Sequence, residues 1–141
     1  QDIIIFSAAV SDYKPSITYN KKIKKNSDDL KLSLSKTEDI LKDLGQRKKN
    51  QVLFGFALET DNEIDNAKKK LKYKNLDTII LNSLNDKGAG FGFDTNKITI
   101  IDNKLNIKKY PLMSKKELSK IIVKHATNLF YERFDVKNKS L

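Results

Sequence analysis

Four of the lysines at the end of one predicted helix have a spacing that suits chemistry on an anion. Lys70 and Lys74 are one turn apart along one edge of the apolar stripe of residues 60–73, whereas Lys68 and Lys72 lie along the other edge. Two like charges at this spacing repel on an isolated helix, and a phosphate between them would reverse that repulsion. We therefore predict that Lys70 and Lys74 bind phosphate and that Lys68 and Lys72 face solvent. The alternative is an ordinary solvated face.

Small and acidic residues follow the first predicted strand, at residues 2–6. Ala8 and Ala9 allow a ligand to approach the backbone closely, and Asp12 offers a carboxylate to a ribose hydroxyl or to metal-bound water. A tight turn with a capping Asp is the alternative. This loop is a candidate binding segment.

Two other predicted strands end in residues that suit a ligand. Phe56 follows a glycine near the end of the second strand, where its ring could pack against a base, and core packing is the alternative. Asn82 comes directly after the third strand and would hydrogen-bond either a ligand or its own turn. The run Gly88–Gly92 matches no phosphate-loop pattern and is predicted to be a turn. His125 lies on the apolar side of the last predicted helix and is predicted to be a packing residue.

The order of predicted elements indicates an α/β fold. Continuous apolar runs, typical of strands buried on both faces, occupy residues 2–6, 51–57 and 77–81. Helices are predicted over residues 37–44, 60–73 and 114–133, with capping boxes at Thr60/Glu63 and Ser114/Glu117. Residues 97–101 and 105–109 read as a hairpin. We expect a mainly parallel sheet with helices on both faces and the hairpin as an antiparallel edge, and ligands at the carboxyl ends of its strands.

Residues 13–34 have a different character and are predicted to form a projecting arm. A polar segment leads to the basic cluster Lys21–Lys25, and Leu30, Leu32 and Leu34 alternate with polar residues as in a half-exposed strand. The first strand starts at the first residues of the chain, so we expect a further segment to precede residue 1.

The composition narrows the class of protein. The 141 residues, 38% apolar and 33% charged, suit one domain over residues 1–141, and no apolar run reaches the ~18 to 20 residues of a membrane span. We expect a cytoplasmic protein. Zero cysteines exclude thiolate zinc sites and cysteine nucleophiles, and a single histidine disfavours a histidine triad. The net charge of +10 favours an anionic partner: nucleic acid, a membrane surface or a phosphorylated small molecule.

Six motifs, in order, resemble those of phosphopantothenoylcysteine synthetase, also called phosphopantothenate–cysteine ligase. In many bacteria that enzyme is the C-terminal half of a bifunctional coenzyme A biosynthesis flavoprotein. The motifs are Ala8–Tyr13, Lys22–Lys25, Lys36–Ile40, Gly55–Thr60, Lys70 with Lys74–Asp77 and Asn82, and Gly90–Phe91 with Asp94 and Asn96. The match covers nearly all of residues 2–125.

The resemblance implies a Rossmann-like, homodimeric, nucleotide-binding ligase domain that uses CTP, or ATP in some relatives, with Mg²⁺ carried by the nucleotide. The substrates of such an enzyme would be 4'-phosphopantothenate and cysteine, joined through an acyl-cytidylate. The resemblance implies no nucleic-acid or membrane partner and no metal ion held by the protein. The implied nucleotide contacts are Ala8, Ala9, Asp12, Lys22, Thr37, Glu38, Asp39, Ile40, Phe56, Lys70 and Lys74. Ala9 and Asn82 would contact the acid substrate, and Lys22 would be a catalytic lid residue.

Three departures from the family pattern are visible. Thr37–Ile40 replaces Asn-Pro-Asp-Ile, and Leu58 stands where the family has a second small residue after Phe56. The family's opening strand, glycine-rich loop and an Asn that steadies the acyl-nucleotide are expected before residue 1. No flavin decarboxylase domain is expected within these residues.

Two other classes of function remain open. A basic nucleic-acid-binding domain would spread its lysines over one face and bind any polyanion with steep salt dependence, but exposed interleaved aromatic residues are missing. A nicotinamide-dependent oxidoreductase is disfavoured by the lack of GxGxxG in these residues.

Overall fold

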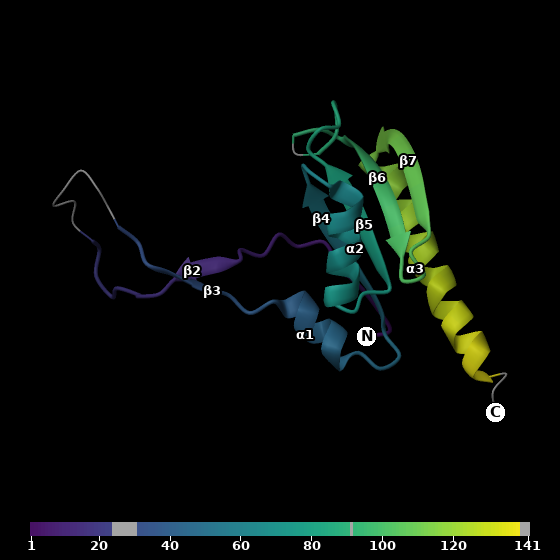
Figure 1. Cartoon of the computed structure of the whole chain (residues 1–141), viewed down its shortest axis with the longest axis horizontal. Coiled ribbons are helices and arrows are strands. Elements are labelled where there is room, and N and C mark those ends of the chain that lie inside the picture. Colours follow the sequence, from purple (N-terminus) through teal and green to yellow (C-terminus); the bar gives the residue numbers. More distant parts are fainter. Residues whose placement is uncertain (24–30, 91, 139–141) are drawn as a thin grey trace. The chain divides into compact units, whose positions relative to one another are not determined.

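The computed structural model describes residues 1–23, 31–90 and 92–138, and the chain divides into two compact units. The larger unit comprises residues 1–7 and 41–141, and the smaller unit comprises residues 8–40. The segment predicted as an arm, residues 13–34, falls inside the smaller unit. Figure 1 shows the elements in sequence colours.

The larger unit is built on a five-stranded sheet of order β1-β4-β5-β6-β7. β1 (Ile3–Phe6), β4 (Val52–Glu59) and β5 (Thr78–Ser83) pair in parallel, and β6 (Thr95–Asp102) and β7 (Ile107–Ser114) extend them as an antiparallel hairpin. The predicted α/β sheet with an antiparallel edge hairpin is therefore confirmed. The hairpin is longer than predicted at both of its open ends.

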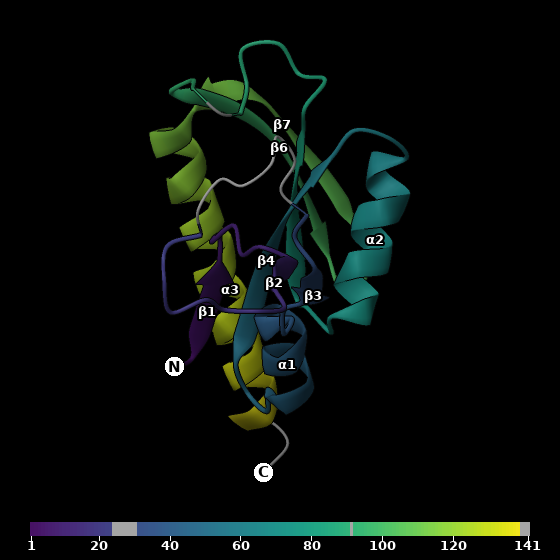
Figure 2. The ribbon, with the colours of Figure 1, turned by 90° about the vertical axis from the view of Figure 1, so that its left-hand side faces the viewer.

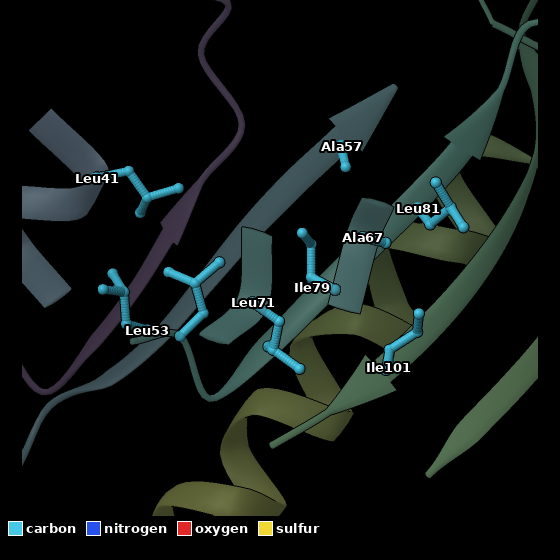
Figure 3. Close-up of a cluster of buried hydrophobic side chains, with 9 residues drawn as sticks. Leu41, Leu53, Ala57, Ala67, Leu71, Ile79, Leu81 and Ile101 are labelled. Atoms are coloured by element: carbon cyan, nitrogen blue, oxygen red, sulfur yellow. The ribbon is translucent and has the colours of Figure 1, made fainter. Parts of the chain in front are cut away.

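Helices cover both faces of this sheet, as predicted (Figure 2). α1 (Ile40–Arg47) and α2 (Glu63–Tyr73) pack on one face through Leu41, Ala67 and Leu71, against strand residues such as Leu53 and Ile79 (Figure 3). α3 (Lys115–Asn138) covers the other face through Leu118, Ile122 and Ala126. The three layers follow from strands that are apolar on both sides.

The prediction that β1 is buried on both faces is wrong. Ile3, Ile4 and Phe6 are half-buried, and Ile5 is 36% exposed, whereas Val52 and Phe54 of β4 are fully buried. The reason is position, because β1 ends the strand order of the described residues and pairs only with β4. A continuous apolar run cannot by itself distinguish an end strand from a central one.

One of the two predicted capping boxes forms. Ser114 and Glu117 bond reciprocally, with Glu117 N 3.2 Å from Ser114 Oγ and Ser114 N 3.1 Å from Glu117 Oε2. These bonds lower the pKa of Glu117. The box predicted for Thr60 and Glu63 is wrong, because α2 is capped by Asn62 in the left-handed region, with no side-chain cap bond.

A buried charge network holds the amino ends of the strands together. Asp77, only 2% exposed, accepts hydrogen bonds from Lys48 Nζ at 2.9 Å, from Leu53 N at 2.8 Å and from the Arg133 guanidinium. Arg133 Nη1 also donates to the Gln51 carbonyl at 2.7 Å. Asp77 therefore links β4, β5 and α3 at the edge of the sheet opposite the predicted site.

His125 is a packing residue, as predicted. Its ring meets Phe54 edge-on with centroids 5.7 Å apart, and Nε2 lies 3.4 Å from Thr78 Oγ1. Burial lowers the pKa of His125. The glycine-rich run is a turn in its described part, with positive φ at Gly88, Gly90 and Gly92; Phe91 lies outside the described residues.

The smaller unit contains a two-stranded antiparallel sheet, β2 (Tyr13–Pro15) with β3 (Leu34–Lys36). No described residue of residues 8–40 is buried. Leu32 is exposed and precedes β3, so the predicted strand is shorter than expected. Leu30, Lys24 and Lys25 lie outside the described residues. No helix in the described ranges is long and apolar enough to cross a bilayer.

Candidate functional site

The carboxyl ends of β4 and β5 carry a polar cluster. Glu59 and Ser83 are paired in the register of these two strands, and α2 begins a few residues beyond Glu59. Both side chains lie on the α2 side of the sheet, because Glu59 contacts Asn66 and Lys70 of α2 and Ser83 contacts Glu63 of α2. This is the edge at which ligands bind in open α/β sheets.

Lys70 is directed at the end of β4 by an ion pair. Its Nζ lies 2.5 Å from Glu59 Oε1, and the Glu59 side chain is 11% exposed compared with 47% for Lys70. Asn66, one turn earlier on α2, places Nδ2 3.5 Å from Glu59 Oε2 and 2.9 Å from the Asp61 carbonyl. The amine predicted to bind phosphate is thus fixed at the expected edge.

A second set of bonds fixes the loop after β5 to the start of α2. Asn85 Nδ2 lies 2.9 Å from the Thr60 carbonyl and 3.2 Å from Glu63 Oε1, and Ser83 Oγ donates to the same Glu63 oxygen. This explains why Glu63 does not form the predicted capping box. Its carboxylate holds β5 and α2 together at the candidate site.

Lys74 lies at the other end of α2. It is the C-cap, and its amide nitrogen is 3.0 Å from the Lys70 carbonyl. A Cβ added to Gly45, in α1, would come within 1.8 Å of the Lys74 carbonyl, so α1 packs directly on this turn. Lys72 is exposed, as predicted, whereas Lys68 is half-buried, so the prediction that Lys68 simply faces solvent is wrong. The helix therefore carries Lys70 and Lys74 one turn apart, with Lys70 the one held at the strand ends.

Phe56 and Asn82 lie on the opposite face of the sheet, toward α3. Phe56 packs against the cluster that contains Ile80 and Ile98, and Asn82 pairs with Leu58 and Ile98 in the sheet register. Asn82 Oδ1 is buried and accepts no hydrogen bond from any described residue. A buried acceptor without a partner costs about 1–3 kcal/mol. A donor on a ligand would remove that cost.

The smaller unit brings together two segments that the sequence predicted to share a ligand. Thr37 N lies 3.0 Å from the Asp12 carbonyl, and Thr37 Oγ1 donates to the Ser11 carbonyl at 2.5 Å. Thr37, directly after β3, therefore lies beside the loop that begins at Ala8. The remaining predicted contacts of this unit, Ala9, Lys22, Glu38, Asp39 and Ile40, are exposed.

The described residues contain no group of three or more acidic or histidine side chains able to hold a metal ion. Sequence reasoning missed Glu59 and Asn66 as members of the cluster. A usable signal was present: an acidic residue that ends a buried strand, followed eleven residues later by a helical lysine. Such a carboxylate needs a cationic partner, because a buried charge is costly when unpaired.

Comparison with known proteins identifies the family. Residues 1–129 match the family described as DNA/pantothenate metabolism flavoprotein C-terminal domain. The chain belongs to this family. The resemblance read from the six motifs is thereby confirmed.

Individual relatives agree with this assignment. The chain is 46% identical over 118 residues to the coenzyme A biosynthesis bifunctional protein CoaBC of Bacillus subtilis (strain 168), covering 84% of this chain and 29% of that protein. It is 53% identical over 131 residues to a cysteine/cysteine sulfinic acid decarboxylase of an unknown prokaryotic organism, covering 92% of this chain and 36% of that protein. The chain thus spans about a third of the length of these curated relatives.

A solved structure shares the fold. The C-terminal domain of a coenzyme A biosynthesis bifunctional protein CoaBC superposes with a TM-score of 0.73 at 34% identity, covering 93% of this chain and 56% of that one. The family assignment therefore rests on both sequence and fold.

Proposed function

We propose that this chain is the ligase domain that joins 4'-phosphopantothenate to cysteine in coenzyme A biosynthesis, with CTP as the energy source. The family match over residues 1–129 is the observation that carries this proposal. Two relatives named CoaBC, 46% and 48% identical to this chain, support the same assignment.

The proposed reaction has two steps. The carboxylate of 4'-phosphopantothenate attacks the α-phosphorus of CTP, forming an acyl-cytidylate and releasing pyrophosphate. The amine of cysteine then attacks the acyl carbon, the bond to the cytidylate oxygen breaks, and CMP leaves. Negative charge builds on phosphate oxygens in the first step, so fixed cations supply the main stabilisation and no cysteine or histidine nucleophile is needed.

The residues of the larger unit suit the phosphate and acid ends of this reaction. Lys70 presents a fixed ammonium at the strand ends, and Lys74 lies one turn further along α2. Asn82 offers its unpartnered oxygen to a donor on the acid substrate. Phe56 packs against the core cluster on the α3 side and is only half-buried, so the exposed part of its ring is proposed as the nucleotide contact. We propose that Mg²⁺ arrives with the triphosphate, whose oxygens are ligands that this ion prefers.

The residues of the smaller unit suit the nucleoside. Ala8 and Ala9 allow close approach to the backbone, Asp12 takes a ribose hydroxyl, and Thr37, Glu38, Asp39 and Ile40 follow β3 beside them. Lys22 is proposed to be the catalytic lid residue, because an exposed cation carried by a loop can close over the triphosphate. We also propose a homodimer that works in the cytoplasm.

One assay tests this proposal. The full-length natural protein is incubated with CTP, Mg²⁺, 4'-phosphopantothenate and cysteine, and the coupled product is measured by mass spectrometry, with ATP in a parallel reaction. We expect a product that requires all four components, with CTP preferred. Release of carbon dioxide from cysteine without use of a nucleotide would instead favour the chemistry named for the decarboxylase relative. Binding of DNA with steep salt dependence and no product would favour a nucleic-acid-binding domain.

A further inference from the structure

The contact between Glu59 and Lys70 joins a nearly buried carboxylate to a half-exposed amine. The two charged atoms are 2.5 Å apart, and the side chains are 11% and 47% exposed. Asn66 Nδ2 also approaches the same carboxylate, at 3.5 Å from Oε2. Two residues four positions apart on α2 therefore converge on the end of β4, and Glu59 is the group that they share.

The pair leaves Lys70 able to bind a second anion. A lysine ammonium has three protons that it can donate, and one of them is used on Glu59. Because nearly half of the Lys70 side chain is exposed, its other protons can reach a ligand. A free lysine side chain samples many rotamers, so a fixed partner lowers the entropy lost when that ligand binds.

Glu59 cannot release Lys70 when an anion arrives. A nearly buried carboxylate that loses its counterion is strongly unfavourable, and a single new hydrogen bond from Lys70 to a phosphate would not compensate for the loss. Lys70 must therefore hold Glu59 and the ligand at the same time. The carboxylate acts as a fixed support for the amine, and the phosphate does not displace it.

We propose that Glu59 is a positioning residue that holds Lys70 Nζ at the carboxyl end of β4, where it meets the triphosphate of the nucleotide. This inference rests on the proposed function, in which Lys70 is a nucleotide ligand. Glu59 does not touch the nucleotide, and its effect on binding passes through Lys70.

A double-mutant cycle tests the proposal. The affinity of the full-length natural protein for CTP with Mg²⁺ is measured by calorimetry for wild type, Glu59→Gln, Lys70→Gln and the double variant. We expect Glu59→Gln to weaken CTP binding about tenfold, and to change it less than about twofold when Lys70 is already Gln. Glu59→Asp keeps the charge and should lose less affinity than Glu59→Gln. Asp65→Asn, the same charge change on the exposed face of α2, should have an effect below about twofold.

Three outcomes would overturn the proposal. An equal loss from Glu59→Gln in both backgrounds would mean that Glu59 supports the fold at large, while the nucleotide site itself would stand. Tighter CTP binding by Glu59→Gln would mean that the carboxylate only competes with phosphate. No CTP binding by wild type would remove the proposed function together with this inference. If Glu59→Gln does not fold, the same cycle with Glu59→Asp decides between these outcomes.

Discussion

Replacing Asp77 by Asn tests whether Asp77, which ends the family-like run Asn75-Leu76-Asp77, acts on the fold and not on the chemistry. The Asp77 side chain is 3% exposed and carries the charges of Lys48 and Arg133, whose side chains are 12% and 26% exposed. Asn at this position would leave the charges of Lys48 and Arg133 without a counterion. Its NH₂ group would also face hydrogen-bond donors where Asp77 has a carboxylate oxygen that accepts from them. Removing one partner of a buried pair costs about 3–5 kcal/mol.

We therefore expect Asp77→Asn to lower the free energy of unfolding by about 3–5 kcal/mol, a large share of the ~5–15 kcal/mol of a typical domain. The midpoint of thermal unfolding should fall by roughly 10–20 °C. Urea titration followed by circular dichroism measures the free energy directly, and an unchanged slope confirms that the unfolded state is the same.

Asp43→Asn is the matched control. Asp43 also pairs with an arginine, Arg47, but the two side chains are 54% and 69% exposed, so the change should lie within about 0.5 kcal/mol of zero. The CTP affinity of the folded fraction of Asp77→Asn should equal that of wild type. A loss of less than about 1 kcal/mol would refute the argument that the network holds the amino ends of the strands together.

Three other predictions follow from the site and the core. Lys70→Gln or Lys74→Gln should weaken CTP binding by about ten- to a hundredfold, the effect of one charge-assisted hydrogen bond, while Lys72→Gln should have little effect in the same calorimetric assay; equal losses at all three would indicate diffuse polyanion binding. Lys22→Gln should keep CTP affinity within a few-fold and lower turnover by roughly two to three orders of magnitude in steady-state kinetics; wild-type turnover with a hundredfold weaker affinity would make Lys22 an ordinary phosphate ligand. Because burial lowers the pKa of His125, its imidazole binds a proton more readily in the unfolded chain, and the free energy of unfolding should fall as the pH drops below about 6.5. His125→Phe should remove that part of the pH dependence in urea titrations at pH 7.5 and 5.5. If the variant and wild type lose the same free energy of unfolding between these two pH values, the prediction is wrong.

The strands of the sheet and the helices that cover it could be predicted from the sequence, because the patterns that indicate them lie within short segments. The apolar runs of β4 and β5 and the periodicity of α2 depend only on neighbouring residues. The exposure of Ile5 was not predictable in the same way, because it depends on which strands stand beside β1. The failure of the predicted capping box at Glu63 could not be predicted for the same reason. The Glu63 carboxylate accepts hydrogen bonds from Ser83 and Asn85, which lie about twenty residues later in the sequence.

The residues of the candidate site also fall into those that short segments could predict and those that depend on the packing of distant elements. Phe56, Lys70, Lys74 and Asn82 could be proposed from loops, helix spacing and family resemblance, since each signal is contained in a short segment. The partner of Lys70 could not be found that way, because the pairing of Glu59 with a residue eleven positions later depends on how α2 packs on β4. The orphan oxygen of Asn82 likewise became visible only once its neighbours in the sheet were placed.

Release of pyrophosphate from CTP by the full-length natural protein tests the central claim most directly. The acid is the first nucleophile in the proposed order, so pyrophosphate should appear only when 4'-phosphopantothenate is present, and CMP should appear only when cysteine is added as well. Exchange of labelled pyrophosphate into CTP should likewise require the acid. Exchange without the acid, or coupled product without loss of CTP, would contradict the acyl-cytidylate mechanism and the ligase assignment that depends on it.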